Sequence, residues 1–241
     1  FIFYVKILDK TNQFNQTKQK NNSKMVDDIS LGKIKIETVE NYGVRLANGL
    51  KTIEQNLINK LHSEIFARIN TSNSIHFIGN GGSYANAHHI VGDYLKTFSF
   101  EGIRLNVNCM ADNACFLTAA SNDYNYDEVY AVLVGTIINK GDLIVYLSGS
   151  GNSMNLIKCA NKAKEFGIKQ VSVTAYNGGQ LKNIVNIPIY IECYDMEVAE
   201  DCQISIFHNI KQRLMNDLTK NKSHKTNMTK YIKRTIDNLI A

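Results

Sequence analysis

The stretch "IGNGGSYANAHH" (78–89) places three glycines, a serine and two adjacent histidines directly behind a short apolar run. An apolar run followed by a glycine turn and a helix-forming segment is typical of a strand that passes through a tight turn into a helix. Glycines in such a turn let the backbone approach an anion at the helix N-terminus. The GxGxxG spacing of a dinucleotide fingerprint and the GKS/T of a Walker loop are absent, so this turn alone leaves open a phosphate cradle, a metal site or a simple turn.

A second loop of the same kind, "LSGSGNS" (147–153), favours a ligand site over two simple turns. It also follows an apolar run and precedes a helical segment. The hydroxyls of Ser148, Ser150 and Ser153, with the backbone N–H groups of Gly151 and Asn152, suit a neutral cradle for a phosphate monoester. In an open α/β sheet, ligands bind beyond the carboxyl ends of the strands, where both loops are expected.

Around these loops, short β-branched runs alternate with helix-length segments, which predicts an α/β fold with a mainly parallel sheet covered by helices on both faces. Pro188, the only proline, lacks a backbone donor and indicates an edge strand or a strand start. A stripe of Leu and Ile between Leu46 and Ile69 predicts one long helix before the first strand. Strands are expected at 75–78, 103–109, 143–147, 171–175 and 187–191, and further helices near 84–97, 125–138, 153–166 and 199–219.

The length of 241 residues allows one such domain with tails. We expect a disordered polar tail at 1–24, the domain at 25–219 and a basic extension at 220–241. Basic residues are concentrated near both ends and leave a net negative charge on the remainder, which argues against nucleic acid on the folded body. The chain lacks the roughly 18 uncharged apolar residues of a membrane span. Its five cysteines form no CxxC pair, which indicates reduced thiols in a cytoplasm.

Five motifs occur in a fixed order: "GNGGS…AHH…D", "ASNDYNYDEVY", "SGSGNS", "NGG" after the fourth expected strand, and a glutamine early in the last long helix. The same motifs in the same order are found in the SIS-domain phosphosugar isomerases. The chain therefore resembles this family over about residues 35–219, and it resembles the phosphoheptose (sedoheptulose-7-phosphate) isomerases most of all. The resemblance implies a flavodoxin-like sheet of five parallel strands and a homotetramer with active sites at subunit interfaces. It also implies the interconversion of a ketoheptose phosphate with its aldose isomer.

The resemblance assigns substrate binding to both glycine loops and to the "SND" motif. In the second loop Gly149 stands where the family has a threonine, which removes one hydroxyl and keeps a backbone N–H. Gln203 matches the glutamine that faces both substrate and metal. The implied substrate-binding residues are Asn80, Gly81, Gly82, Ser83, Asn122, Asp123, Ser148, Gly149, Ser150, Ser153 and Gln203.

The family moves a proton between C1 and C2 through an enediol, using a glutamate base and a histidine that belong to a zinc site in many members. His89 falls on the first metal position, and Asp93, one helical turn later, stands where the family has glutamate. Lys211 takes the place of the second histidine, eight residues after Gln203. The resemblance therefore implies His89, Asp93 and Gln203 as zinc ligands and Asp93 and Lys211 as catalytic residues. Since a protonated lysine cannot ligate zinc, this site is incomplete relative to the family, although a cation can stabilise an enediolate.

The other two nearby histidines are expected outside this site. His208 follows Gln203 by five residues, about 140° around a helix, and should face elsewhere. His88 lies about 100° from His89 and is expected at the surface or in an interface. Non-functional roles also stay open for two of these residues. His89 can be a helix histidine that binds no metal, and Lys211 can be a surface lysine at the start of a basic tail.

Three functions are compatible with the sequence. The leading hypothesis is a cytoplasmic isomerase of sedoheptulose 7-phosphate. The second is a non-catalytic SIS module that binds a phosphosugar or a partner protein such as a replication initiator, and the third is an isomerase of another phosphosugar. The carboxylate at position 93 favours an enzyme, whereas a lysine in place of the second histidine favours a binding module.

Overall fold

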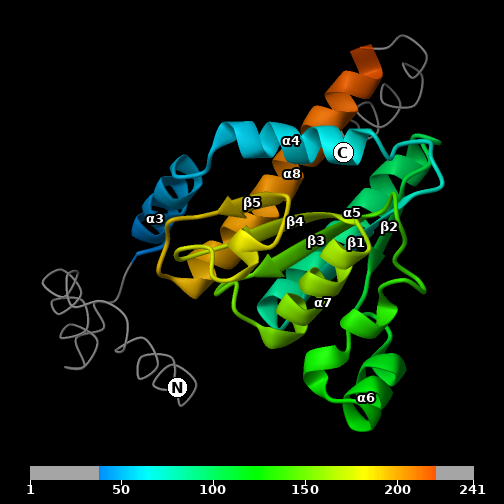
Figure 1. Ribbon diagram of the computed structural model, residues 1–241. Helices are drawn as coiled ribbons and strands as arrows, with labels where there is room; N and C mark the ends of the chain where they lie inside the picture. The colour runs from blue at the N-terminus through cyan, green and yellow to red at the C-terminus, as the bar shows by residue number, and fades with distance from the viewer. Residues whose placement is uncertain (1–37, 221–241) are drawn as a thin grey trace, which may run out of the picture. The chain divides into compact units, whose positions relative to one another are not determined.

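The computed structural model describes residues 38–220, and all structural statements concern these residues (Figure 1). The chain divides into two units between Tyr42 and Gly43, within α3 (Val39–Lys51), and the fold described is that of the second unit. The polar tail expected at 1–24 and nearly all of the basic extension lie outside the described residues, so the domain limits stay a prediction. The helices and strands are α3 (Val39–Lys51), α4 (Gln55–Phe66), β1 (Ser74–Gly79), α5 (Gly82–Phe100), β2 (Asn106–Cys109), α6 (Ala114–Asp123), β3 (Leu143–Ser148), α7 (Met154–Glu165), β4 (Lys169–Thr174), β5 (Ile187–Tyr190) and α8 (Met196–Lys220).

The five strands form one sheet in the order β2-β1-β3-β4-β5, with every neighbouring pair parallel. The central strands β1, β3 and β4 are buried over nearly their whole length, because helices cover both faces of a parallel sheet. β5 lies at one edge and contains Pro188, which is paired with Ser172 of β4. The predicted parallel sheet and the edge position of the proline are confirmed.

Successive residues of β1 show which helices cover which face. Phe77 packs on Tyr94 of α5 and on Phe207 of α8, with ring centroids 6.4 and 5.2 Å apart. The next residue, Ile78, belongs to the apolar cluster that includes Leu156 of α7. Because side chains alternate between the two faces of a strand, α5 and α8 cover one face and α7 the other (Figure 1). The pairing of α5 with α8 brings together the two helices that carry the expected catalytic residues.

The single long helix expected between residues 46 and 69 is wrong. α3 ends at Lys51 and α4 begins at Gln55. Between them the hydroxyl of Thr52 donates a hydrogen bond of 2.7 Å to the carbonyl oxygen of Gly49, and Glu54 adopts an extended backbone. The apolar spacing continues in phase across this break, so periodicity cannot reveal it.

The prediction of a helix at 125–138 is also wrong. The helices predicted near 84–97, 153–166 and 199–219 are confirmed as α5, α7 and α8. Two 3₁₀ turns, Tyr126–Glu128 and Ala131–Leu133, occupy the segment instead. The side chain of Asn125 accepts a hydrogen bond of 2.9 Å from the N–H of Asp127, and Gly135 has a φ of 86°. Asn125 caps the start of the first turn and Gly135 follows the second, while the buried apolar residues of the segment imitate a helical stripe.

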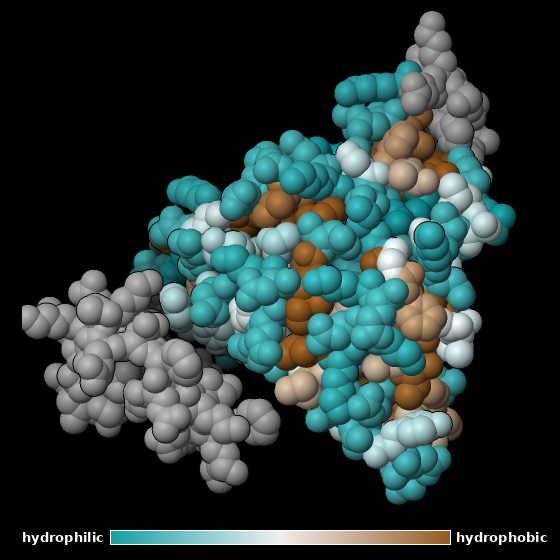
Figure 2. Space-filling view, viewed as in Figure 1, coloured by the Kyte–Doolittle hydropathy of each residue, from teal (hydrophilic) through white to brown (hydrophobic). Residues whose placement is uncertain are grey.

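The surface in Figure 2 is mostly hydrophilic, with separate hydrophobic patches. None of the helices at residues 38–220 is long and apolar enough to cross a membrane. All five cysteines are unpaired, and burial raises the pKa of Cys109, Cys159 and Cys202 to about 12. These three thiols are therefore packing residues and poor nucleophiles.

Candidate active site

A cavity of about 220 Å³ lies at the carboxyl ends of β1 and β3. The strand order reverses between these two neighbours, and such a switch point is where open α/β sheets bind ligands. Both glycine loops contribute to the wall, so the structure brings together the two motifs that the sequence singled out. The lining residues are Asn80, Ser83, Leu147, Ser148, Gly149, Ser150, Ser153, Met196 and Glu200.

The serine loop is organised by its own backbone. The N–H of Gly151 donates to Ser148 Oγ at 3.1 Å, and the N–H of Asn152 donates to Ser150 Oγ at 3.2 Å. These two N–H groups, expected to hold phosphate, are therefore engaged within the loop. A hydroxyl that accepts a hydrogen bond keeps its own hydrogen to donate, so Ser148 and Ser150 are oriented donors for an anion. Ser153 precedes α7 and makes no side-chain cap, which leaves its hydroxyl available to a ligand at this helix N-terminus.

The "NGG" turn at 177–179 packs against the serine loop. A side chain on Gly151, whose φ is 65°, would overlap the carbonyl oxygen of Gly178. The N–H of Leu181 donates to the carbonyl oxygen of Gly151 at 3.1 Å, and the N–H of Gln180 donates to Asn152 Oδ1, also at 3.1 Å. Only glycine allows this close approach, so two turns from different parts of the chain stiffen each other.

The side chain of Asn80 is held by two residues to which the sequence assigned no role. Asn80 and Asn155 exchange amide hydrogen bonds of 2.9 and 3.0 Å, and the hydroxyl of Tyr126 donates to Asn80 Oδ1 at 2.9 Å. Asn155 is almost fully buried. Because an amide nitrogen carries two hydrogens, one N–H of Asn80 stays available to a ligand. Tyr126 lies in the "ASNDYNYDEVY" motif, but nothing in the local sequence marks Asn155.

The first turns of α8 complete the cavity. The sulfur of Met196 fills the space that a side chain on Gly149 would need, and the carboxylate of Glu200 does the same over Gly82. A side chain at position 149, such as the threonine that the resemblance implies, would require the flexible thioether of Met196 to move. Burial, and then the nearby Glu197 and Asp201, raise the pKa of Glu200. Met196 lies in none of the sequence motifs, and Glu200 is marked only by its spacing of eight residues from His208.

Further along the same two helices, His89, Asp93 and His208 form a cluster. His89 Nε2 lies 3.2 Å from His208 Nε2, and Asp93 Oδ2 lies 3.8 Å from the same nitrogen. One ligand atom from each of the three side chains lies within 4.8 Å of the others. Zinc ligands at about 2.0 to 2.2 Å from a tetrahedral ion are roughly 3.3 to 3.6 Å apart, so small rotations of these side chains would fit the ion.

The expectation that His208 faces elsewhere is wrong. The side chain of Gln203 faces the sheet, where it donates to the carbonyl oxygen of Val173, whereas His208 lies on the face of α8 that meets His89. His208 follows Glu200 by eight residues, which is the spacing that the resemblance implies between the glutamine and the second histidine. Glu200 lies three residues, nearly one helical turn, before Gln203.

Lys211 joins the cluster through an ion pair between its ammonium group and Asp93 Oδ2. Its side chain is only 19% exposed, so Lys211 is not a freely solvated surface lysine. The same carboxylate oxygen is the one nearest to His208. The lysine therefore does not replace a missing histidine, because the histidine is present beside it.

Gln203 lies outside this cluster. Its side chain is fully buried, accepts a hydrogen bond of 3.0 Å from Asn86 and donates one of 3.4 Å to the carbonyl oxygen of Val173. Both ends of the amide are thus engaged away from His89 and Asp93. Its predicted role as a zinc ligand has no support from this geometry.

The remaining residues that the sequence assigned to the site do not line the cavity. Gly81, with a φ of 56°, precedes the first residue of α5. Asn122 and Asp123 end α6, are exposed and are not among the residues that line the cavity. His88 is exposed and pairs with Asp112 at 2.7 Å, so its predicted surface position is confirmed.

Residues 40–175, more than half of the chain, match the family model described as the SIS domain. The chain belongs to the SIS-domain family. It is 32% identical to a probable phosphoheptose isomerase of Thermoplasma volcanium, over 66% of this chain and 82% of that protein. It is 29% identical to the phosphoheptose isomerase of Helicobacter pylori strain P12, over 68% and 84%. A solved phosphoheptose isomerase from Neisseria gonorrhoeae has the same fold, with a TM-score of 0.66 and 21% identity over 73% of this chain and 94% of that one.

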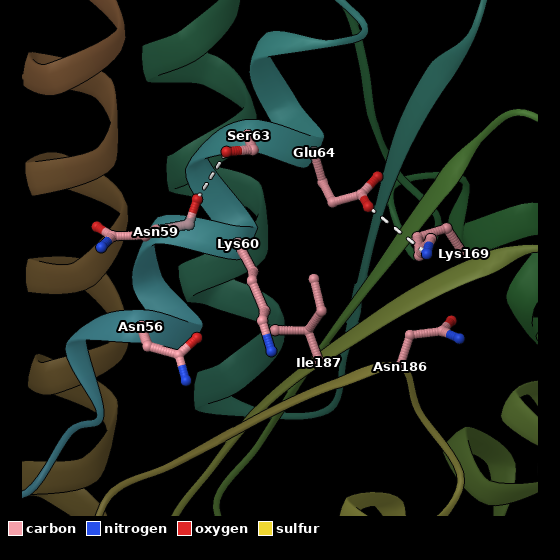
Figure 3. A pocket seen from close by; sticks show the side chains of 8 residues that line it. All are labelled: Asn56, Asn59, Lys60, Ser63, Glu64, Lys169, Asn186 and Ile187. Atoms are coloured by element: carbon pink, nitrogen blue, oxygen red, sulfur yellow. Dashed lines mark hydrogen bonds and ion pairs between the residues drawn. The ribbon is translucent and has the colours of Figure 1, made fainter.

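This SIS domain has a second cavity, of about 420 Å³, between α4 and the amino ends of β4 and β5 (Figure 3). Glu64 and Lys169 form an ion pair of 3.6 Å there, and the hydroxyl of Ser63 donates to the carbonyl oxygen of Asn59 at 3.0 Å. Open α/β sheets bind ligands at the other ends of their strands. The larger cavity is therefore the weaker candidate for the active site.

Proposed function

We propose that this chain is an aldose–ketose isomerase that interconverts sedoheptulose 7-phosphate and a heptose 7-phosphate. The observation that carries the proposal is the gathering of a carboxylate, two imidazoles and an ammonium group on α5 and α8, beyond a cavity built for an anion. Ser83 in the cavity wall and His89 in the cluster are six residues apart, about 9 Å along the helix. That separation suits a sugar whose reacting carbons lie far from its phosphate. The relatives named phosphoheptose isomerase support the same substrate.

In the proposed reaction, the cavity holds the phosphate and the cluster moves the protons. The carboxylate of Asp93 takes a proton from C1 of the ketose, and the electrons of that C–H bond form an enediolate with its charge on O2. A proton then passes from O1 to O2, and the proton held by Asp93 returns to C2, which leaves an aldehyde at C1. His208 is suited to the transfer between the oxygens, and the ammonium group of Lys211 stabilises the enediolate.

We also propose that His89, Asp93 and His208 hold zinc, with a fourth position open to substrate. The bound ion would supply a Lewis acid for the sugar oxygens. Two imidazoles and a carboxylate are suitable donors for this ion. The donor set differs from the one expected from the sequence, because His208 takes the place of Gln203.

A homotetramer and a cytoplasmic location complete the proposal. Leu95 and Phe100 on α5 are 44% and 46% exposed, which supports association with other copies of the chain. Unpaired cysteines support a reducing compartment. Sedimentation of the purified protein tests the tetramer, and a monomer at micromolar concentration would contradict it.

A non-catalytic phosphosugar-binding module is the second candidate. The observation that favours it is the ion pair between Lys211 and Asp93, because the ammonium group occupies a carboxylate oxygen of the proposed base. Such a module would bind sedoheptulose 7-phosphate and release it unchanged. Turnover therefore separates the two functions.

The deciding experiment follows sedoheptulose 7-phosphate by NMR with purified protein, with and without zinc. We expect the aldose signal to appear with the wild type, and the rate to fall by at least about 10²-fold in His208→Ala, because a positioned acid or base contributes 10² to 10⁴. His88→Ala is the matched control, because it removes the neighbouring exposed imidazole and should keep the wild-type rate. Binding without turnover in the wild type would favour the module, and a wild-type rate in His208→Ala would remove that residue from the mechanism.

A further inference from the structure

Within residues 38–220, two side chains of α5 donate hydrogen bonds to the backbone of α8. The amide of Asn86 donates to the carbonyl oxygen of Glu200 at 2.9 Å. About two turns further along each helix, the hydroxyl of Tyr94 donates to the carbonyl oxygen of Phe207 at 3.0 Å. Contacts at two separate points limit both how far one helix can slide along the other and how far it can turn. The position of α8 on α5 is therefore set by polar contacts as well as by apolar packing.

The hydrogen bond of Tyr94 lies inside an aromatic part of the core. Tyr94 is only 1% exposed, and the centroid of its ring lies 6.4 Å from that of Phe77 and 5.8 Å from that of Phe98. Phe207 packs on the same Phe77 ring at 5.2 Å. A buried hydroxyl cannot exchange its partner for water, so loss of this bond would leave an unsatisfied polar group in the core. The packed ring thus aims the hydroxyl at one carbonyl oxygen of α8.

This hydrogen bond is adjacent in sequence to both helices' contributions to the cluster. Asp93 precedes Tyr94, and His208 follows Phe207. Asp93 Oδ2 lies 3.8 Å from His208 Nε2, and that nitrogen lies 3.2 Å from His89 Nε2. A slide of α8 by the rise of one residue is about 1.5 Å, whereas metal–ligand distances tolerate only about 0.2 Å. The cluster therefore depends on a helix position that is fixed one residue away.

The position of α8 also decides which of its side chains meets His89. His208 and Lys211 are three residues apart, nearly one helical turn. The imidazole lies against His89, while the ammonium group pairs with Asp93. A slide of α8 toward its amino-terminal end would carry the ammonium group toward His89. A protonated lysine cannot ligate a metal, so such a slide would weaken the proposed zinc site.

We propose that Tyr94 is a positioning residue that keeps the imidazole of His208, and not the ammonium group of Lys211, against His89. It acts through the backbone of α8 and not on the reacting atoms. The inference rests on the proposed function in one respect, namely that the cluster holds a metal and moves protons. The contact between His89 and His208, which Tyr94 supports, exists without that function.

The first test is Tyr94→Phe, which removes the hydroxyl and keeps the ring in the aromatic core. We expect zinc affinity, titrated against a chromophoric chelator, to fall about tenfold, because groups that support metal ligands typically contribute 10- to 100-fold. Tyr146→Phe is the matched control. Its hydroxyl is also buried and donates to Gln170 Oε1 at 2.9 Å, within the apolar cluster on the other face of the sheet. Both variants should unfold at lower denaturant concentration, but Tyr146→Phe should keep the wild-type zinc affinity.

The second test needs neither metal nor substrate. The ring centroids of His89 and His208 are 5.4 Å apart, which is close enough for a nuclear Overhauser contact between ring protons in a histidine-labelled sample. This contact should be present in the wild type and in Tyr146→Phe, and it should weaken in Tyr94→Phe.

The outcomes separate this inference from the proposed function. Where the wild type binds zinc, unchanged affinity in Tyr94→Phe would overturn the positioning role, and so would equal losses in Tyr94→Phe and Tyr146→Phe. A wild type that binds no zinc would refute the proposed metal site, and an unchanged contact between the two histidines in Tyr94→Phe would then overturn the role. Zinc loss confined to Tyr94→Phe, in a chain that shows no turnover in the NMR assay, would refute the isomerase and leave the positioning role standing.

Discussion

The cavity at the strand ends and the cluster on α5 and α8 are built in opposite ways. The cavity wall consists largely of two short loops, in which glycines allow close backbone contacts and backbone N–H groups orient the serine hydroxyls. The cluster consists of ionisable side chains, and their meeting depends on how two long helices pack. The proposed binding half is therefore shaped by the backbone, and we expect single side chains of the proposed catalytic half to change without affecting it.

The largest effect that tests this division is expected at Asp93. Asp93→Asn keeps the shape of the side chain but cannot accept the proton from C1, so the isomerisation rate should fall by about 10² to 10⁴-fold. Affinity for sedoheptulose 7-phosphate in calorimetry should change little, because the cavity is separate. Asp112→Asn is the control, since Asp112 pairs with His88 outside the cluster and should keep the rate. Loss of binding together with rate in Asp93→Asn would show that the two halves are not independent.

The same division explains what the sequence could predict. The strands, Pro188 and both glycine loops were placed correctly, because apolar runs and glycine turns are local signals that survive into the fold. The place of His208 in the cluster was not predicted. His208 and Lys211 are only three residues apart on the same helix, and the apolar pattern does not show which of them faces His89. Glu200 was missed together with His208, because it stands eight residues before it, at the spacing that the resemblance implies. Met196 was missed for another reason, because it packs against Gly149, which is far from it in sequence and near only in the fold.

A smaller effect is expected in the binding half. Ser150→Ala and Ser153→Ala each remove a hydroxyl that can donate to a charged phosphate, and such hydrogen bonds contribute about 1.5 to 3 kcal/mol. The dissociation constant for sedoheptulose 7-phosphate in calorimetry should therefore rise by roughly 10 to 100-fold in each variant. Zinc affinity should stay the same, because the cluster does not include these residues. Ser205→Ala on α8, outside the cavity, is the control for both measurements, and unchanged sugar affinity in both loop variants would remove the phosphate role of this loop.

The smallest expected effect concerns the competition between Lys211 and zinc for Asp93. The ammonium group contacts Asp93 Oδ2, and that oxygen is also the one that lies 3.8 Å from His208 Nε2. A zinc ion held by the cluster must therefore displace the ammonium group or share the oxygen with a like charge. Lys211→Met keeps a long flexible side chain and removes the charge, so zinc should bind about tenfold more tightly. Titration against a chromophoric chelator measures this without reference to activity.

Two further variants serve as controls for the zinc titration of Lys211→Met. Lys220→Met removes a lysine from the exposed end of the same helix and should leave zinc affinity unchanged, which separates local competition from a general change of charge. In a His89→Ala background the gain from Lys211→Met should shrink or vanish, because the oxygen released from the lysine stabilises zinc only where the imidazoles hold the ion beside it. Equal zinc affinity in the wild type and in Lys211→Met would mean that the ammonium group leaves Asp93 at no cost.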